Sequence, residues 1–306
     1  IDPRPLLLPL ALFGKIGGAA TMIGDPPNII VGNALKEYID FNDFLRVMAP
    51  GVVLTVPVVL LFVRWHYGKD FYSQELVVDL EKMKRAYPIR DMPLLIRSGI
   101  VLCFVIVLFF LHPVIHFSPS YAALFGAIAI LLTGPEHDFE HALEKVEWDS
   151  LLFFAGLFVF TEGIAELGLL REISDALSSL IEMVPVEKRS QVAIVLVQVV
   201  AAVASAFVDN IPFTTTMLPV IVQIADNVDG VHIKGLGWAL CFGADFGGMG
   251  TLIGASANIV MAGIAHEAGF HVTFSQFFKI GFPAMWISLA VSVCYLCMLE
   301  GVGALE

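Results

Sequence analysis

Long uncharged apolar runs alternate with short polar segments along most of this chain. The longest run extends from Ser98 to Pro135 and contains no Asp, Glu, Lys or Arg in 38 residues. Pro113 and Pro119 interrupt this run, so the pattern predicts two helices joined by a turn. Shorter uncharged runs predict further helices at Val47–Val63, Ser190–Val208, Phe246–Ala265 and Ile280–Leu299. Because about 20 mostly apolar residues are enough to cross a bilayer core, we expect an all-α polytopic membrane protein.

Composition and charge support a membrane protein and exclude a nucleic-acid-binding protein. Of the 306 residues, 58% are hydrophobic and only 15% are charged, whereas a soluble domain has about 45–50% apolar and about 25% charged residues. Asp and Glu outnumber Lys and Arg by 29 to 17, which gives a net charge of -12. This acidic balance, without a basic cluster interleaved with aromatic residues, excludes nucleic acid as a partner. The partner that the composition indicates is the lipid bilayer.

Two segments of the chain are related to each other. GGAATMIGDPPNI at Gly17–Ile29 aligns with GGMGTLIGASANI at Gly247–Ile259, with seven identities in 13 positions. The similarity resumes where Phe41, Phe44, Arg46 and Pro50 match Phe274, Phe277, Lys279 and Pro283. Such self-similarity indicates two related halves. We therefore assign residues 1–65 to the remnant of a first repeat and residues 94–306 to a second repeat.

The segment between these repeats is polar. Seven of the 17 Lys and Arg residues fall between Arg64 and Arg97. Because basic residues are enriched in cytoplasmic loops, we predict a hydrophilic cytoplasmic loop at residues 66–93. Apolar residues at helical spacing within Gln74–Ala86 are typical of a short amphipathic helix or of a solvated linker helix.

The related segments carry the glycines and prolines that interrupt helices. Matched interruptions are typical of secondary transporters, where broken helices bind ions near the bilayer midplane. Unwound backbone in hydrocarbon is costly unless protein, water or a ligand satisfies its polar groups. Close helix packing would explain the glycines alone, but not the paired Thr and Asn residues. We expect helix breaks or hinges at Gly17, Gly18, Gly24, Pro26, Pro27, Pro212, Gly247, Gly248, Gly250 and Gly254, with a sharp bend after Asp25.

Polar residues within the apolar runs form a candidate ion site. Asp209 opens the sequence DNIPFTTT, whose carboxylate, amide and hydroxyl oxygens suit Na+ or a proton, and it is the expected carrier of the coupling ion. Asp245 is either a second carboxylate of the site or a charge at the end of a loop. The predicted ion ligands are Thr21, Asp25, Asn28, Asp209, Asn210, Thr214, Thr215, Asp245, Thr251, Ser256 and Asn258. We expect no metal site and no cofactor other than Na+ or H+ as a coupling ion.

Three of these segments carry a resemblance to a known superfamily. GGAATMIGDPPN, SAFVDNIPFTTTMLPVI and GGMGTLIGASAN resemble signatures of the ion transporter superfamily, which includes arsenite permeases, sodium/proton antiporters, citrate transporters and divalent anion/sodium symporters. The chain is most similar to the pink-eyed dilution (P) protein branch. The resemblance implies inverted repeats with re-entrant hairpins and discontinuous helices, a homodimer, and an ion and substrate site at Asp209–Thr216, Thr251–Asn258 and Thr21–Asn28. It also implies earlier spans, so we expect an N-terminal truncation before Ile1.

The predicted function is secondary active transport of a small ion, either an anion or Na+ in exchange for H+. Such a transporter would set the ion content and pH of a compartment, from the plasma membrane or an organelle membrane. One alternative is a passive anion channel, since channel filters also use carbonyl and hydroxyl oxygens. The other is an intramembrane enzyme with Asp209 and Asp245 as an acid/base pair. Because an enzyme does not need two matched half-sites, we expect that the protein is not an enzyme.

Overall fold

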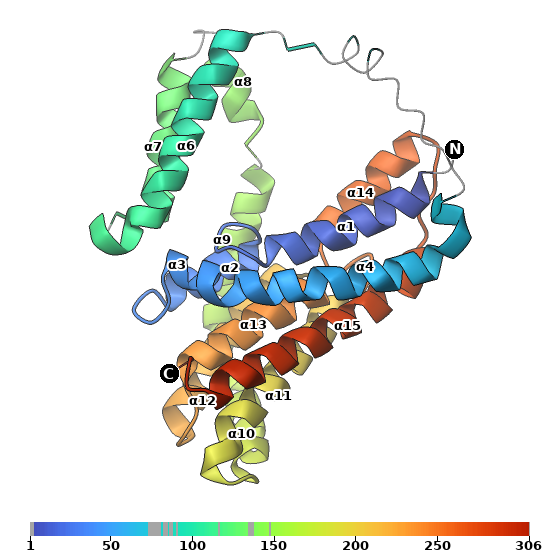
Figure 1. Ribbon diagram of the computed structural model, residues 1–306. Helices are drawn as coiled ribbons and strands as arrows, with labels where there is room; N and C mark the ends of the chain where they lie inside the picture. Colours follow the sequence, from blue (N-terminus) through green and yellow to red (C-terminus); the bar gives the residue numbers. More distant parts are fainter. Residues whose placement is uncertain are drawn as a thin grey trace. The chain divides into compact units, whose positions relative to one another are not determined.

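The computed structural model describes residues 3–72, 81, 85, 88–89, 91–115, 117–133, 138–146 and 148–305. Every regular element in these residues is a helix (Figure 1). The elements are α1 (Arg4–Gly18), α2 (Pro26–Ala34), α3 (Phe41–Asp43), the π-helix η1 (Phe44–Met48), α4 (Ala49–Tyr72), α6 (Met92–Ile115), α7 (Pro119–Thr133), α8 (Asp138–Glu144), α9 (Trp148–Glu166), α10 (Leu169–Glu182), α11 (Val186–Phe207), α12 (Asn210–Asn227), α13 (Ile233–Gly247), α14 (Ser256–Glu267) and α15 (Phe274–Gly301). The predicted all-α fold is confirmed.

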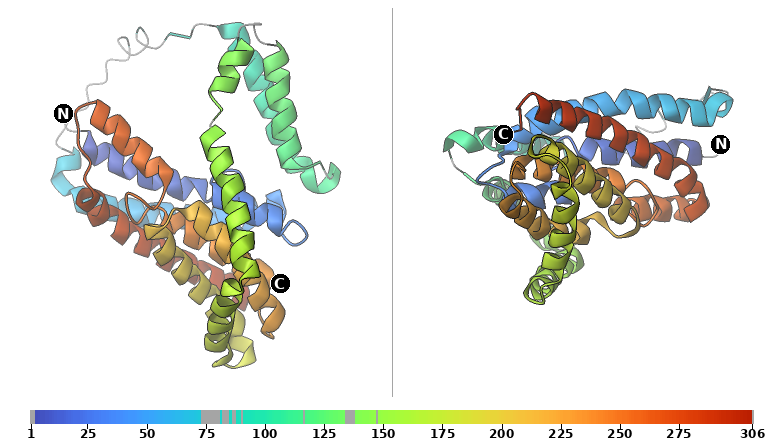
Figure 2. Two further views of the ribbon diagram at one scale, coloured as in Figure 1. Left: turned by 180° about the vertical axis from the view of Figure 1, so that it is seen from behind. Right: turned by 90° about the horizontal axis from the view of Figure 1, so that it is seen from below.

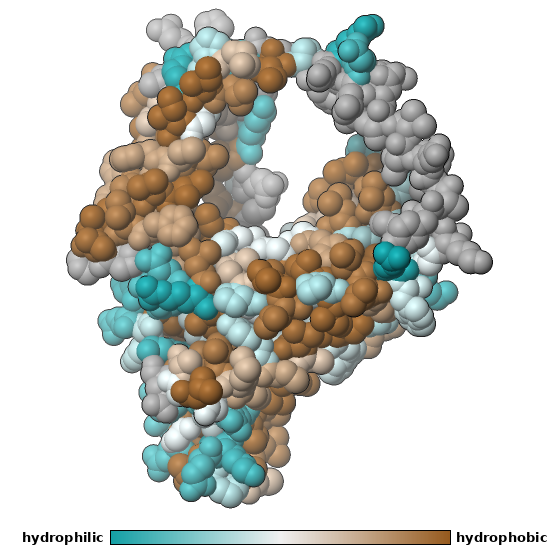
Figure 3. All heavy atoms as spheres, viewed as in Figure 1, coloured by the Kyte–Doolittle hydropathy of each residue, from teal (hydrophilic) through white to brown (hydrophobic). Residues whose placement is uncertain are grey.

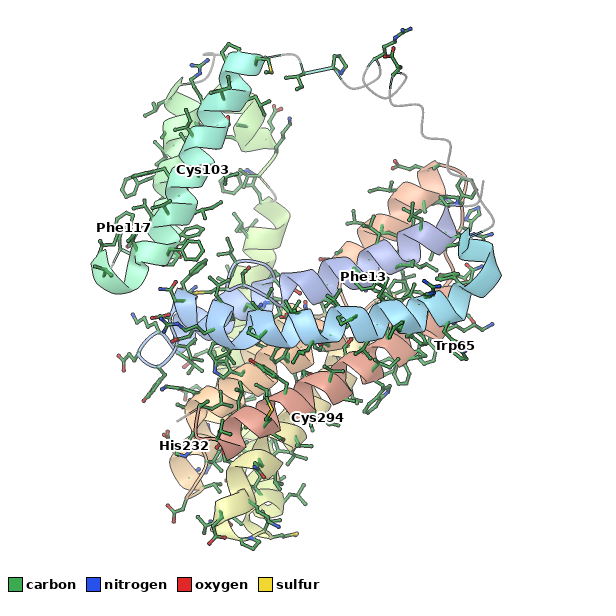
Figure 4. All side chains as sticks on the ribbon, in the orientation of Figure 1. Phe13, Trp65, Cys103, Phe117, His232 and Cys294 are labelled. Carbon is green, nitrogen blue, oxygen red and sulfur yellow. The ribbon has the colours of Figure 1, made fainter. Side chains whose placement is uncertain are left out.

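Four helical segments of the described part are long and apolar enough to cross a membrane. They are Phe41–Gly68, Met92–Leu111, Val186–Phe207 and Phe274–Gly301. Much of their apolar surface is not covered by protein, and the Trp65 side chain at the end of α4 is 79% exposed (Figures 3 and 4). Exposed apolar surface of this extent requires lipid around it. The chain is therefore an integral multi-pass membrane protein.

The helices divide into two compact units, residues 73–155 and a larger unit of residues 1–72 with 156–306. In the smaller unit, α6 and α7 run side by side and are joined by a turn at Phe117, which Figure 4 labels. Gly126 on α7 lies against Val105 on α6, where a larger side chain would collide. The prediction of two helices within Ser98–Pro135 is confirmed.

In the larger unit, α13 is the central helix, and its residues from Gly235 to Gly247 are all buried. Helices α11, α12 and α15 pack around α13 together with α1 and α2, as the views in Figure 2 show. A Cβ atom on Gly243 would lie 2.5 Å from the Cβ atom of Ala201 on α11. Small residues allow this close approach, as is usual between helices in membranes.

The sequence repeat is also a structural repeat. Helices α1 and α13 each end in a non-helical stretch, after which α2 and α14 begin. Further along, capping boxes at Asp40 and Thr273 each open a helical segment of 28 residues. The first segment ends in α4, and the second segment is α15. Helices α4 and α15 lie side by side (Figure 1). The assignments of residues 1–65 to a first repeat, 66–93 to a cytoplasmic loop and 94–306 to a second repeat stay predictions.

Two expectations differ from the structure. The uncharged run Phe246–Ala265 does not form one helix, because the chain unwinds between the end of α13 and the start of α14. Helix α4 continues to Tyr72, past the expected start of the polar loop, with a kink at Gly68 where φ is 46°. The helix predicted at Gln74–Ala86 lies outside the described residues, apart from Glu81 and Arg85.

Candidate functional site

An amide side chain bridges the first helix break, which lies between α1 and α2. Asn28, buried in the first turn of α2, donates from Nδ2 to the carbonyl oxygens of Gly18 (3.4 Å) and Thr21 (3.1 Å). Gly24 approaches so closely that a Cβ atom there would collide with the Gly18 carbonyl oxygen. The side chain of Asn28 thus donates to backbone carbonyl groups at the end of α1 and in the break that follows. Asp25 is extended and α2 begins at Pro26, so the break precedes the two prolines, which lie in the first turn of α2.

The second break, between α13 and α14, repeats this arrangement. Asn258 is buried and donates from Nδ2 to the carbonyl oxygens of Gly248 (2.8 Å) and Thr251 (3.0 Å). A Cβ atom on Gly254 would lie 2.9 Å from the Gly248 carbonyl oxygen. The buried Thr251 hydroxyl donates to the carbonyl oxygen of Ala206 on α11. The paired Asn residues therefore bridge two equivalent breaks, whereas among the described residues the matching contacts do not extend to the Thr hydroxyls.

Gly24→Ala is expected to lower the free energy of unfolding by about 1–3 kcal/mol, because overpacking forces the backbone of the break to move. Gly17→Ala is the matched control, since no atom lies within 4 Å of a Cβ atom at that position. Thermal unfolding of both purified variants measures the difference. Equal midpoints for the two variants would contradict the close approach of Gly24 to Gly18.

Three ionisable side chains are buried next to the breaks. Lys15 of α1 forms an ion pair with Asp25, at 2.6 Å from Nζ to Oδ2. Nδ2 of Asn210, the first residue of α12, lies 3.5 Å from the same carboxylate oxygen. Asp245 lies in the last turn of α13, is fully buried, and interacts electrostatically with Asp25 and Lys15. Residues far apart in the sequence thus form one charged cluster.

Several oxygen atoms at this site have no hydrogen-bond donor among the described residues. Both carboxylate oxygens of Asp245 are in this position, and so are the buried Oδ1 atoms of Asn28 and Asn258. Asn28 and Asp25 are the polar side chains next to the Asp245 carboxylate. Buried oxygen atoms without partners are costly. A proton or a cation such as Na+, which prefers oxygen ligands, would satisfy them.

The structure brings together four of the predicted ligands, namely Asp25, Asn28, Asn210 and Asp245. The reading of Asp245 as a charge at the end of a loop is wrong, because this residue lies in a helix and is 0% exposed. Ser256 is exposed at the start of α14, and no contact with the cluster is described for it.

The DNIPFTTT segment is organised differently from the expectation. The break between α11 and α12 lies at Val208 and Asp209, whereas Pro212 lies in the first turn of α12, where a missing N–H costs little. Asp209 is only half-buried and caps α12 by accepting a hydrogen bond from the Ile211 N–H at 3.1 Å. The buried hydroxyls of Thr214 and Thr215 donate to carbonyl oxygens one turn earlier in the same helix.

Sequence reasoning missed Lys15, which is 9% exposed and lies within the structural site. Lys15 lies between an apolar stretch and Gly17-Gly18, a position that is typical of the end of a membrane span. The signal that was available is the spacing of ten residues between Lys15 and Asp25 across a predicted break.

Comparison with known proteins decides the family. Residues 1–243 match the family described as citrate transporter. The chain belongs to this citrate transporter family. The resemblance to the ion transporter superfamily is thereby confirmed, and the family is one of transporters.

Relatives of this family member include the P protein and mycobacterial proteins. The human P protein is 36% identical over 97% of the chain, which spans 44% of the length of that protein. An uncharacterized transporter of Mycobacterium tuberculosis is 36% identical over 97% of the chain and 68% of its own length. A 46 kDa membrane protein of Mycobacterium leprae is 38% identical, with the same two shares covered. The resemblance to the P protein branch is confirmed.

Proposed function

We propose that this chain carries the ion-binding part of a secondary active transporter of a small ion. The ion is an anion, or Na+ in exchange for H+, and transport sets the ion content and pH of a compartment. The observation that carries the proposal is the pair of equivalent helix breaks, bridged by Asn28 and Asn258, with a buried charged cluster beside them. In many secondary transporters the ion and substrate sites lie between two such repeats and are formed by broken helices.

The two breaks differ in the charge that they favour. Pro26 and Pro27 remove the first backbone N–H groups of α2, so the N-terminus of α2 does not favour an anion. In the second break, α14 begins with Ser256 and Ala257, which keep their N–H groups and have no side-chain cap from the preceding Ala255. Helix N-termini with available N–H groups attract anions. This asymmetry supports coupling between a cation in the buried cluster and an anion at the N-terminus of α14.

A transport assay with the full-length protein in sealed liposomes tests this proposal. We expect proton movement across an imposed pH gradient when one of Na+, chloride, citrate or arsenite is added. The same ion, placed on the far side, should accelerate uptake of its labelled form, because a carrier returns faster when loaded. Flux without this acceleration and without proton movement would indicate a passive channel and contradict the proposal.

The resemblance also implies a homodimer, and we include it in the proposal. The mass of the full-length protein in detergent, measured by light scattering with the detergent contribution subtracted, is expected to be that of two chains. A mass of one chain in mild detergent and in nanodiscs would contradict it.

A further inference from the structure

The charges of the buried cluster do not balance. Asp25 and Asp245 contribute two carboxylates and Lys15 contributes one ammonium group, and Asp25 and Lys15 are the charged partners of Asp245 among the described residues. The polar groups that the described part of the chain places beside the cluster are neutral; they are Asn28 on α2, Asn210 on α12, Ser205 on α11 and the Cys241 thiol one turn earlier on α13. When all three side chains are ionised, the cluster carries one net negative charge in a buried place, where an unpaired charge is strongly unfavourable.

The ammonium group belongs to one of the two carboxylates. Lys15 Nζ lies 2.6 Å from Asp25 Oδ2, and both side chains are less than one-tenth exposed. The Asp245 carboxylate is 0% exposed and both its oxygen atoms lack a hydrogen-bond partner in the described part of the chain. The positive charge that would neutralise the cluster is therefore absent at Asp245, because the Lys15 ammonium group is already paired with Asp25.

We propose that Lys15 is a built-in counter-ion that limits the Asp25–Asp245 pair to one exchangeable monovalent cation, a proton or Na+, held at Asp245. Lys15 neutralises Asp25 and is part of the polypeptide, so this positive charge cannot leave the site during transport. A second cation would have to displace the Lys15 ammonium group from Asp25 within the buried site. The inference rests on the proposed function in taking this cluster as the coupling site.

Charge counting gives a distinct expectation for each variant. The wild-type protein and Lys15→Arg should hold one cation, because the fixed positive charge is present in both. Lys15→Met should hold two cations, because both carboxylates then lack a fixed partner. The double variant Lys15→Met/Asp25→Asn removes the ion pair as a whole and should hold one, whereas Asp245→Asn should hold none.

Binding to the purified full-length protein in detergent measures these numbers without requiring transport. Infrared spectroscopy in sodium-free buffer counts buried protonated carboxyl groups, and equilibrium dialysis with radiolabelled Na+ counts bound sodium ions. If Na+ shares the site, it removes the carboxyl band as it binds; if only a proton binds, the band stays. Both results support the inference when the count is one cation for the wild-type protein, Lys15→Arg and the double variant, two for Lys15→Met and none for Asp245→Asn.

A Lys15→Met variant that still holds one cation would overturn the inference, and so would an Asp245→Asn variant that keeps the cation. If Lys15→Met does not fold, the double variant and Asp245→Asn decide, because equal counts in these two would also overturn it. The transport assay remains separate. Loss of coupled flux with the expected binding counts would contradict the proposed function alone, and wrong counts with intact coupled flux would contradict only the role of Lys15.

Discussion

Asp245→Asn is expected to abolish ion-coupled transport by the full-length protein in liposomes, with the initial rate lowered about 100-fold or more. Asp245 is fully buried and its carboxylate has no hydrogen-bond partner among the described residues. An amide of the same size keeps the packing of α13 but removes the charge that holds the coupling ion. The loss of about 3 kcal/mol of interaction with the ion corresponds to a roughly 100-fold loss of occupancy.

Two further variants serve as controls for this result. Asp226→Asn changes an exposed carboxylate near the end of α12 and should leave the rate unchanged. Asp209→Asn keeps the cap of α12, because Asn caps helices about as well as Asp. We expect Asp209→Asn to retain most of the coupled flux. Full loss with Asp209→Asn, together with retained flux in Asp245→Asn, would return the role of carrier to Asp209.

Asn258→Ala is expected to lower the free energy of unfolding by about 2–4 kcal/mol. The substitution removes the donor shared by the carbonyl oxygens of Gly248 and Thr251, and each buried acceptor left without a partner costs about 1–3 kcal/mol. Asn28→Ala, at the equivalent position of the first break, should have a similar effect. Asn227→Ala is the matched control because Asn227 is exposed at the end of α12.

The thermal unfolding of these variants, followed by near-UV circular dichroism in detergent, measures the expected losses. The midpoints of Asn28→Ala and Asn258→Ala should both fall well below that of Asn227→Ala. If the three midpoints agree, the two amide side chains do not hold the helix breaks together.

The membrane helices could be predicted from the sequence because lipid imposes a simple requirement on them. Segments such as α11 and α15 must be uncharged over about 20 residues, and such runs are visible without any knowledge of tertiary structure. The first break could also be predicted, since Pro26 and Pro27 cannot continue a helix from the preceding residues, and the repeated motif extends this prediction to the second break. These features are local, and local chemistry decides them.

The roles of the charged residues could not be predicted in the same way. Helix α13 is buried on all sides, so no apolar stripe distinguishes the face that carries Asp245. The contact between Asp25 and Asn210 joins residues 185 positions apart and depends on how α2 meets α12. Asp209 satisfies the polarity pattern of an ion ligand and that of a helix cap equally well, and only the position of Ile211 N–H distinguishes these roles.

The most direct test of the ion site is a cryo-electron microscopy map of the full-length protein at high resolution, with and without Na+ at alkaline pH. The account predicts additional density in contact with the Asp245 carboxylate and the Asn28 side chain, next to the Lys15–Asp25 ion pair, which disappears in Asp245→Asn. If protons alone are bound, the two maps agree, and Asp245 stays within the same buried cluster. Ion density at Asp209 and the Thr214–Thr216 hydroxyls, with none at Asp245, would contradict the account.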